Sequence, residues 1–74
     1  MDYSIIIVKD TGAPGGEGNT VVSSLAGTYP DFNPDATKMN AQQALDDCNN
    51  KCAEGFYAAM VEPGSFQIGQ LFAG

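Results

Sequence analysis

The clearest strand signal in the chain is the run Tyr-Ser-Ile-Ile-Ile-Val-Lys at residues 3–9. β-Branched residues dominate this run, and an Asp-Thr-Gly turn follows it. Successive strand residues point to opposite faces of a sheet, so Ile6 and Val8 face one way and Ile5 and Ile7 face the other. Because a strand that is apolar on both faces is usually covered on both, we expect something to pack on each side of this segment.

The main helix is predicted over about 38–53, with Thr37 as its N-cap and Gly55 as a left-handed stop. Small and apolar residues recur there at helical spacing and predict one buried stripe: Ala41, Ala44, Leu45, Cys48 and Cys52. A single stripe covers a single face of a sheet, so the opposite face needs another cover.

Two further strands are expected at 56–62 and 66–72. The sequence Pro63-Gly64-Ser65 between them suits a type II turn, which predicts a hairpin.

Residues 20–26, Thr-Val-Val-Ser-Ser-Leu-Ala, are ambiguous. They fit a short helix from an Asn19 cap to a Gly27 stop, which we favour slightly. The paired valines also fit a strand that returns along the first one.

Together these segments predict a single α+β domain over residues 1–74. Its small sheet has three to four strands and one main helix packed on one face, in the order β–(short α or β)–α–β–β. The second apolar face is then covered by residues 20–36 or by another chain, and we weigh the two equally.

Composition excludes several classes of function. The 74 residues contain nine acids, three lysines and no histidine, which gives a net charge of −6. This balance argues against direct nucleic-acid binding, which needs clustered basic residues. Without histidine the chain lacks the usual neutral-pH acid–base group, and nothing indicates a membrane span. We therefore predict no enzyme, no catalytic residues, no cofactor and no metal.

The glycine-rich loop at 10–19 lacks the lysine of a phosphate-binding loop. The only two cysteines, Cys48 and Cys52, lie four residues apart on the predicted stripe. A regular helix does not readily give disulfide geometry at that spacing, so we expect two reduced thiols that pack in the core. Reduced thiols indicate a cytoplasmic setting. If the chain is a viral accessory protein, this setting is the cytoplasm of an infected host cell.

Residues Asp31, Asn33 and Asp35 have the alternating spacing that opens a calcium loop. The glycine and the closing glutamate of such a loop are missing, since Ala36 and Gln42 stand in their places. We favour a turn in which these side chains bond to the local backbone, and a calcium-binding module stays the weaker alternative.

The resulting hypothesis is a non-enzymatic protein-binding accessory protein. A virus- or phage-type acidic inhibitor that docks on a basic host protein is its narrower form. The alternative is a structural subunit, such as a virion decoration or tail component, that pairs through sheet edges or as a homo-oligomer. The partner-binding residues are predicted to be three aromatic anchors and three acids that steer a basic partner: Tyr3, Tyr29, Tyr57, Asp46, Asp47 and Glu54.

Overall fold

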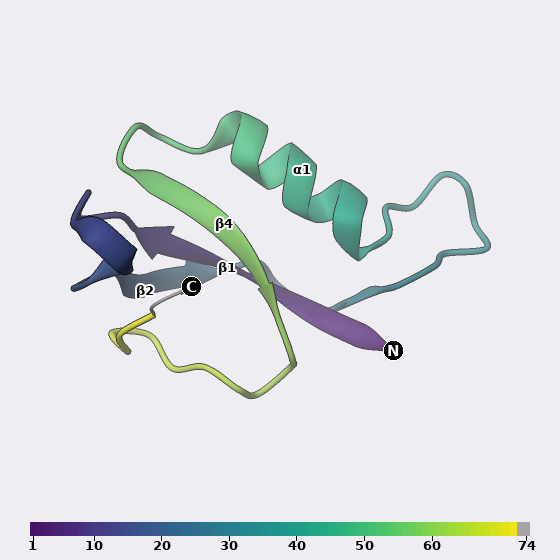
Figure 1. Ribbon diagram of the computed structural model, residues 1–74. Helices are drawn as coiled ribbons and strands as arrows, with labels where there is room; N and C mark the ends of the chain where they lie inside the picture. The colour runs from purple at the N-terminus through teal and green to yellow at the C-terminus, as the bar shows by residue number, and fades with distance from the viewer. Residues whose placement is uncertain (73–74) are drawn as a thin grey trace.

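The computed structural model describes residues 1–72 and places one α-helix on a four-stranded antiparallel sheet (Figure 1). The predicted class, a small α+β domain with one main helix, is confirmed. The elements in chain order are β1 (Asp2–Lys9), the short 3-10 helix η1 (Pro14–Gly16), β2 (Thr20–Ser24), β3 (Tyr29–Pro30), α1 (Ala41–Lys51) and β4 (Phe56–Val61).

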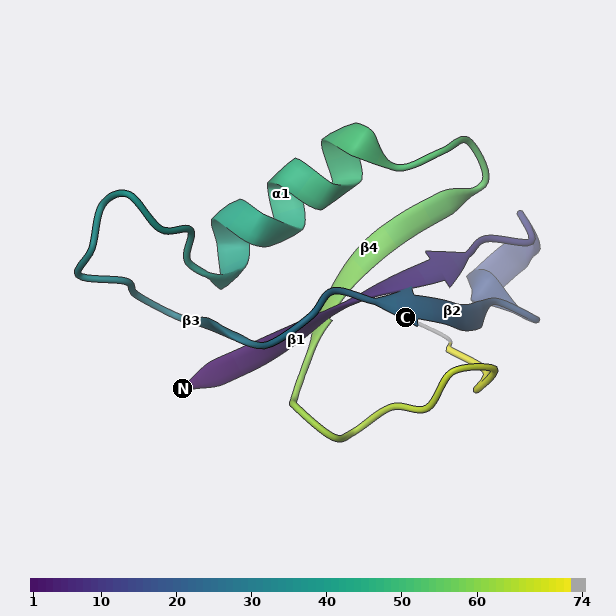
Figure 2. The ribbon, with the colours of Figure 1, turned by 180° about the vertical axis from the view of Figure 1, so that it is seen from behind.

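Strand β1 is the centre of the sheet and pairs antiparallel with the other three strands. Strand β4 runs along one side of it, from the Ser4–Val61 pair to the Lys9–Phe56 pair. Strands β2 and β3 share the other side, where β2 lies beside the second half of β1 and β3 lies beside its start (Figure 2). The strongest strand signal in the sequence therefore forms the element on which all others assemble.

The alternation predicted for β1 is confirmed by two separate apolar clusters. Ile5 is buried with Ala44 of α1 and Ala58 of β4, on the helix side of the sheet. Ile6 and Val8 are buried with Val21 of β2 on the opposite side. Each of the residues Ile5, Ile6, Val8 and Val21 is 0% exposed.

The slight preference for a helix over 20–26 is wrong, because this segment contains strand β2. The β2 backbone pairs with the edge of β1 that β4 does not occupy, and the backbone N–H and C=O groups on that edge would otherwise lack partners. Val21 pairs with Val8 and is buried, which a short surface helix would not achieve. A register shift between Ile7 and Val8 makes Val22 an extra residue, and Ser23 pairs with Ile7 in its place.

Helix α1 begins three residues later than predicted, at Ala41, and Asn40 is its N-cap in place of Thr37. The Asn40 side chain accepts from the Gln43 amide at 2.9 Å, and the Gln43 side chain accepts from the Asn40 amide at 2.9 Å. This reciprocal capping box satisfies two free amide groups of the first turn. Gly55 has a positive φ of 86° but lies in the turn before β4, since the helix ends at Lys51.

The predicted hairpin is half right. Strand β4 and the following turn form as expected, because the Ser65 amide donates to the Glu62 carbonyl at 3.1 Å and Gly64 has a φ of 77°. The chain then leaves β4 and crosses the face of the sheet opposite α1 (Figure 1). There it runs along the outer edge of β2, where the Gly69 amide donates to Val21 and the Phe72 amide donates to Asn19.

The C-terminal segment, residues 66–72, therefore provides the second cover that the sequence demanded. Phe66 and Phe72 pack against the cluster of Ile6, Val8 and Val21. The expectation that residues 20–36 would cover this face is wrong, and cover by another chain stays a prediction. Over residues 1–72, neither helix combines the length and the apolar character needed to cross a membrane.

Candidate binding groove between α1 and β2

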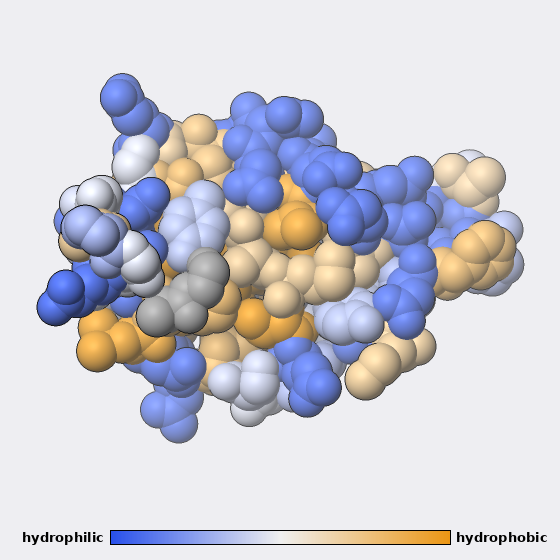
Figure 3. Space-filling view, in the orientation of Figure 1, coloured by the Kyte–Doolittle hydropathy of each residue, from blue (hydrophilic) through white to orange (hydrophobic). Residues whose placement is uncertain are grey.

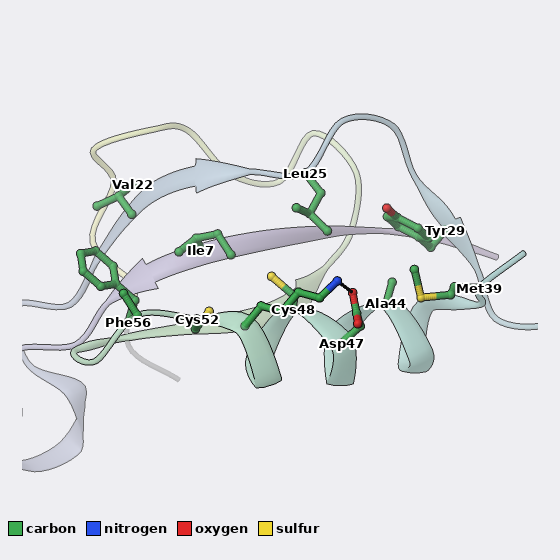
Figure 4. A pocket seen from close by; sticks show the side chains of 12 residues that line it. Ile7, Val22, Leu25, Tyr29, Met39, Ala44, Asp47, Cys48, Cys52 and Phe56 are labelled. Carbon is green, nitrogen blue, oxygen red and sulfur yellow. Dashed lines mark hydrogen bonds and ion pairs between the residues drawn. The ribbon is translucent and has the colours of Figure 1, made fainter.

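An open groove of about 630 Å³ lies on the helix side of the sheet. It runs between α1 and β2, with Ile7 of β1 at its floor (Figure 4). Its lining is mostly apolar: Ile7, Val22, Leu25, Tyr29, Met39, Ala44, Asp47, Cys48, Lys51, Cys52, Ala53 and Phe56. We call it the α1–β2 groove.

The groove exists because α1 covers only part of the sheet. In the described structure α1 contacts β1, β3 and β4 but not β2. The small residues Ala41 and Ala44 face the sheet and are buried, so the helix lies close to β1 and β4. The helix-facing side of β2 is left without a cover.

Exposed apolar side chains stand on the β2 lip of the groove and at its two ends. Val22 is 38% exposed on the β2 lip, while Met39 is 44% and Phe56 is 37% exposed at the two ends. Exposed apolar residues that gather around one hollow are more informative than the same residues scattered singly. On the other side of the molecule, Figure 3 shows hydrophilic side chains over the outer surface of α1 and apolar ones over the sheet below it.

The charged residues of the groove lie on its helix lip. The Lys51 ammonium is 3.0 Å from the Asp47 carboxylate, and both side chains belong to the lining. Asp46, which precedes Asp47 in α1, is exposed and accepts a hydrogen bond from the Gln42 side chain at 3.0 Å. Glu54 is exposed just beyond the helix, next to the lining residue Ala53. Since Lys51 offsets Asp47, the two charged lining residues carry no net charge together, and Asp46 and Glu54 lie outside the lining.

The three predicted aromatic anchors do not share a surface. Tyr29 lines the groove. Tyr3 pairs with Tyr29 in the sheet but lies outside the lining, and a hydrogen bond and the charge of Asp31 raise its pKa. Tyr57 packs on the opposite face, where its hydroxyl accepts a hydrogen bond from the side-chain amide of Asn19 at 3.3 Å.

The two cysteines are both free and half-buried. They pack against the cluster around Ile5, as the apolar stripe predicted, but they also form part of the groove wall. Burial, and then the neighbouring Cys52 thiol, raise the pKa of the Cys48 thiol.

The turn interpretation of Asp31, Asn33 and Asp35 is confirmed for two of these residues. The Asn33 side chain accepts from the Asp35 amide at 3.1 Å, and one Asp35 oxygen accepts from both the amide and the hydroxyl of Thr37. These bonds from Thr37 lower the pKa of Asp35. Over residues 1–72 there is no group of three or more His, Cys, Asp or Glu side chains placed to hold a metal ion.

Part of each long edge of the sheet carries a partner from the chain itself. The outer edge of β2 pairs with residues 69–72. On the outer edge of β4, the Asn49 side chain accepts from the Ala58 amide at 2.8 Å and donates to the Ala58 carbonyl at 3.4 Å. These contacts occupy edge groups that would otherwise be available to pair with another strand.

Sequence reasoning missed the β2 side of the groove, above all Val22 and Leu25. The signal that it could have used is the adjacency of Val21 and Val22, because two neighbouring apolar strand residues face opposite sides. Comparisons with protein-family models, curated proteins and solved structures give no match to this chain. The interpretation of the groove therefore rests on its own geometry: an open apolar channel with the Asp47–Lys51 ion pair on its helix lip, suited to holding apolar side chains.

Proposed function

We propose that this chain is a non-enzymatic protein-binding protein whose α1–β2 groove receives a basic amphipathic helix of a partner. The observation that carries the proposal is the groove itself, which is open, mostly apolar and bounded by exposed Val22, Met39 and Phe56. Grooves of this kind accept the apolar face of a helix through side chains spaced three and four residues apart.

The length of the groove supports a helical occupant. Its helix wall is formed by the 11 residues of α1 and the residues that flank them. At about 1.5 Å per residue, this wall is roughly 16 Å long, which matches about three turns of a second helix.

Charge supports a basic occupant. The chain carries a net charge of −6. Asp47 lines the groove, Glu54 follows the lining residue Ala53, and Asp46 lies on the same helix outside the lining. A helix with lysine or arginine beside its apolar face would meet these acids, and long-range attraction would speed its association. A second copy of this acidic chain would instead be repelled.

The alternative of a structural subunit that pairs through sheet edges has less support. Residues 69–72 occupy the edge of β2, and Asn49 caps the edge of β4 at Ala58. The narrower hypothesis of an acidic inhibitor of a basic host protein, active in the cytoplasm of an infected cell, stays a prediction that follows from charge and size.

The proposal is tested by an NMR titration of the ¹⁵N-labelled chain with a synthetic amphipathic helix of leucines and lysines. A peptide of the same composition in scrambled order is the control. We expect shift changes at Ile7, Val22 and Leu25 with the amphipathic peptide only. Changes confined to other regions, or equal binding of both peptides, would contradict the proposal.

A matched pair of variants makes this test specific to the groove. Val22→Asp puts a charge on the β2 lip and is expected to weaken peptide binding at least about tenfold, which corresponds to about 1.4 kcal/mol. Ile68→Asp changes a residue that is 61% exposed on the C-terminal segment, and binding should not change.

The electrostatic part has its own test. Replacing Asp46, Asp47 and Glu54 by serine should slow association and flatten its dependence on salt, because the steering charges are gone. If the association rate and its salt dependence stay as in the unchanged chain, the acids do not steer the partner.

A further inference from the structure

The two thiols of the groove sit where the helix ends. Cys48 belongs to the last turn of α1, and Cys52 is the residue that caps the helix at its C-terminus. Both line the α1–β2 groove, and both are half-buried (Figure 4). The Cys52 thiol lies close enough to Cys48 to contribute, after burial, to the raised pKa of the Cys48 thiol.

The backbone at Cys52 is not held in the helix. It has an extended conformation, with φ −63° and ψ 141°, and its amide makes only a long bond of 3.4 Å to the Asn49 carbonyl. Residues four apart at a helix end have Cα atoms about 6 Å apart, inside the range of roughly 4.4–6.8 Å that disulfides require, but their Cβ atoms, about 5–6 Å apart, must approach to about 3.5–4.5 Å. Cys52 can therefore turn toward Cys48 without the loss of a regular helical hydrogen bond. Two cysteines inside a helix could not form a disulfide without such a loss.

We propose that Cys48 and Cys52 form a dithiol site that reacts with small-molecule disulfides and closes to an intrachain disulfide inside the α1–β2 groove. Because burial disfavours the Cys48 thiolate, Cys52 attacks first. Its thiolate breaks the S–S bond of the small disulfide, forms a mixed disulfide and releases one small thiolate, which takes up the proton that Cys52 lost. The Cys48 thiolate then attacks the Cys52 sulfur and releases the second small thiol. The protein dithiol loses two electrons and two protons, and the small disulfide gains them.

Closure would control what the groove holds, an extension that rests on the proposed function. Cys52 precedes Ala53 and leads into Phe56, and these three residues form one end of the groove. A disulfide moves the Cys52 side chain toward α1 and holds the start of this connection in place. The oxidised chain should therefore bind the amphipathic probe peptide several-fold more weakly than the reduced chain.

The chemistry is tested on the folded full chain with oxidised glutathione, followed by alkylation and intact-mass measurement. We expect a product that has lost two hydrogens, carries no alkyl group and returns to the dithiol with excess reduced glutathione. The variants Cys48→Ser and Cys52→Ser should each stop at a mixed disulfide with glutathione. A native chain that keeps both thiols, that stops at the mixed disulfide, or that closes only in denaturant would overturn the site.

Control of the groove is tested separately, by titrating the probe peptide into the reduced and the oxidised chain. Weaker binding to the oxidised chain supports control by the disulfide. Equal binding to both forms overturns that control, whereas no binding to either form contradicts the proposed function. The mass measurement does not depend on peptide binding, so these failures are distinguishable.

Discussion

The two faces of the sheet are built around neighbouring residues of β1, but one face is fully covered and the other is covered only in part. The face of Ile6 and Val8 is closed by the C-terminal segment, residues 66–72, and its central side chains are fully buried. The face of Ile5 and Ile7 is covered by α1 over β1, β3 and β4 but not over β2, and the α1–β2 groove stays open beside it. The closed face buries its central side chains, and the open face leaves apolar side chains exposed around the groove.

The difference arises from the shape of each cover. A helix is a rigid rod with one apolar stripe, and the alanines of α1 bring it down over one side of the sheet. The C-terminal segment has no regular structure, so it follows the curved face and places Phe66 and Phe72 where they are needed. An irregular segment can close a face that a single helix leaves partly open.

The largest contrast is expected between two adjacent isoleucines of β1. Ile6→Ala should cost about 3 kcal/mol of unfolding free energy, because Ile6 is fully buried on the closed face. Ile7→Ala should cost less, about 1 kcal/mol, because its cavity opens into the groove. Urea denaturation of both variants measures this difference, and equal losses would contradict the contrast between the faces. If Ile6→Ala does not fold, Ile6→Val should still cost about 1 kcal/mol.

The next contrast concerns the C-terminal segment. Phe66→Ala should cost about 2 kcal/mol, because Phe66 is half-buried and covers the cluster of Ile6 and Val8. Leu71→Ala is the control within the same segment, since Leu71 is 70% exposed, and its effect should stay within about 0.5 kcal/mol. Thermal melting curves compare the two variants. A loss in Leu71→Ala as large as that in Phe66→Ala would mean that the segment acts as a whole, without a specific aromatic contact.

A smaller effect is expected at the edge of β4. Asn49→Ala removes two hydrogen bonds to Ala58 and should cost about 1 kcal/mol, and the exposed edge should promote self-association. The neighbouring Asn50, an exposed residue of the same helix, provides the control Asn50→Ala. Analytical ultracentrifugation and urea denaturation measure the two effects. A monomeric Asn49→Ala with unchanged stability would show that this edge needs no cap.

The smallest expected effect is the pH dependence of the stabilising contribution of Asp35, which lies in the loop before α1 and outside both faces of the sheet. The hydroxyl and amide of Thr37 lower the pKa of Asp35 in the folded chain, so its stabilising contribution is present above the ordinary carboxyl pKa. That contribution is lost as the pH falls through the lowered value. An NMR titration should find the Asp35 midpoint below the ordinary pKa, and Thr37→Ala should move it upward. An unshifted midpoint in the unchanged chain would contradict these hydrogen bonds.

Local signals predicted most of the elements but not their partners. The β-branched run at 3–9 and the stripe from Ala41 to Cys52 each depend on residues close in sequence, and both formed where expected. The segment 20–26 carried two local interpretations, and pairing with β1 decided between them. Thr37 was the predicted N-cap, and the reciprocal bonds with Gln43 make Asn40 the N-cap in its place.

The candidate site was harder to predict than the fold. The sequence marked Tyr29, Asp47 and the two cysteines, all of which line the groove. It also grouped Tyr57 with Tyr29, although they lie on opposite faces. Groove residues come from β1, β2, α1 and the connections between them, so their grouping depends on contacts that no local pattern records.

The sequence by itself determined that β1 is apolar on both sides, that one amphipathic helix follows it and that the chain is strongly acidic, because these are properties of periodicity and composition. Only the tertiary structure decided that the C-terminal segment turns away from β4 to cover Ile6 and Val8, and that α1 leaves β2 uncovered. Those outcomes depend on which distant segments compete for the same apolar surface, and that competition is resolved only when the whole chain packs.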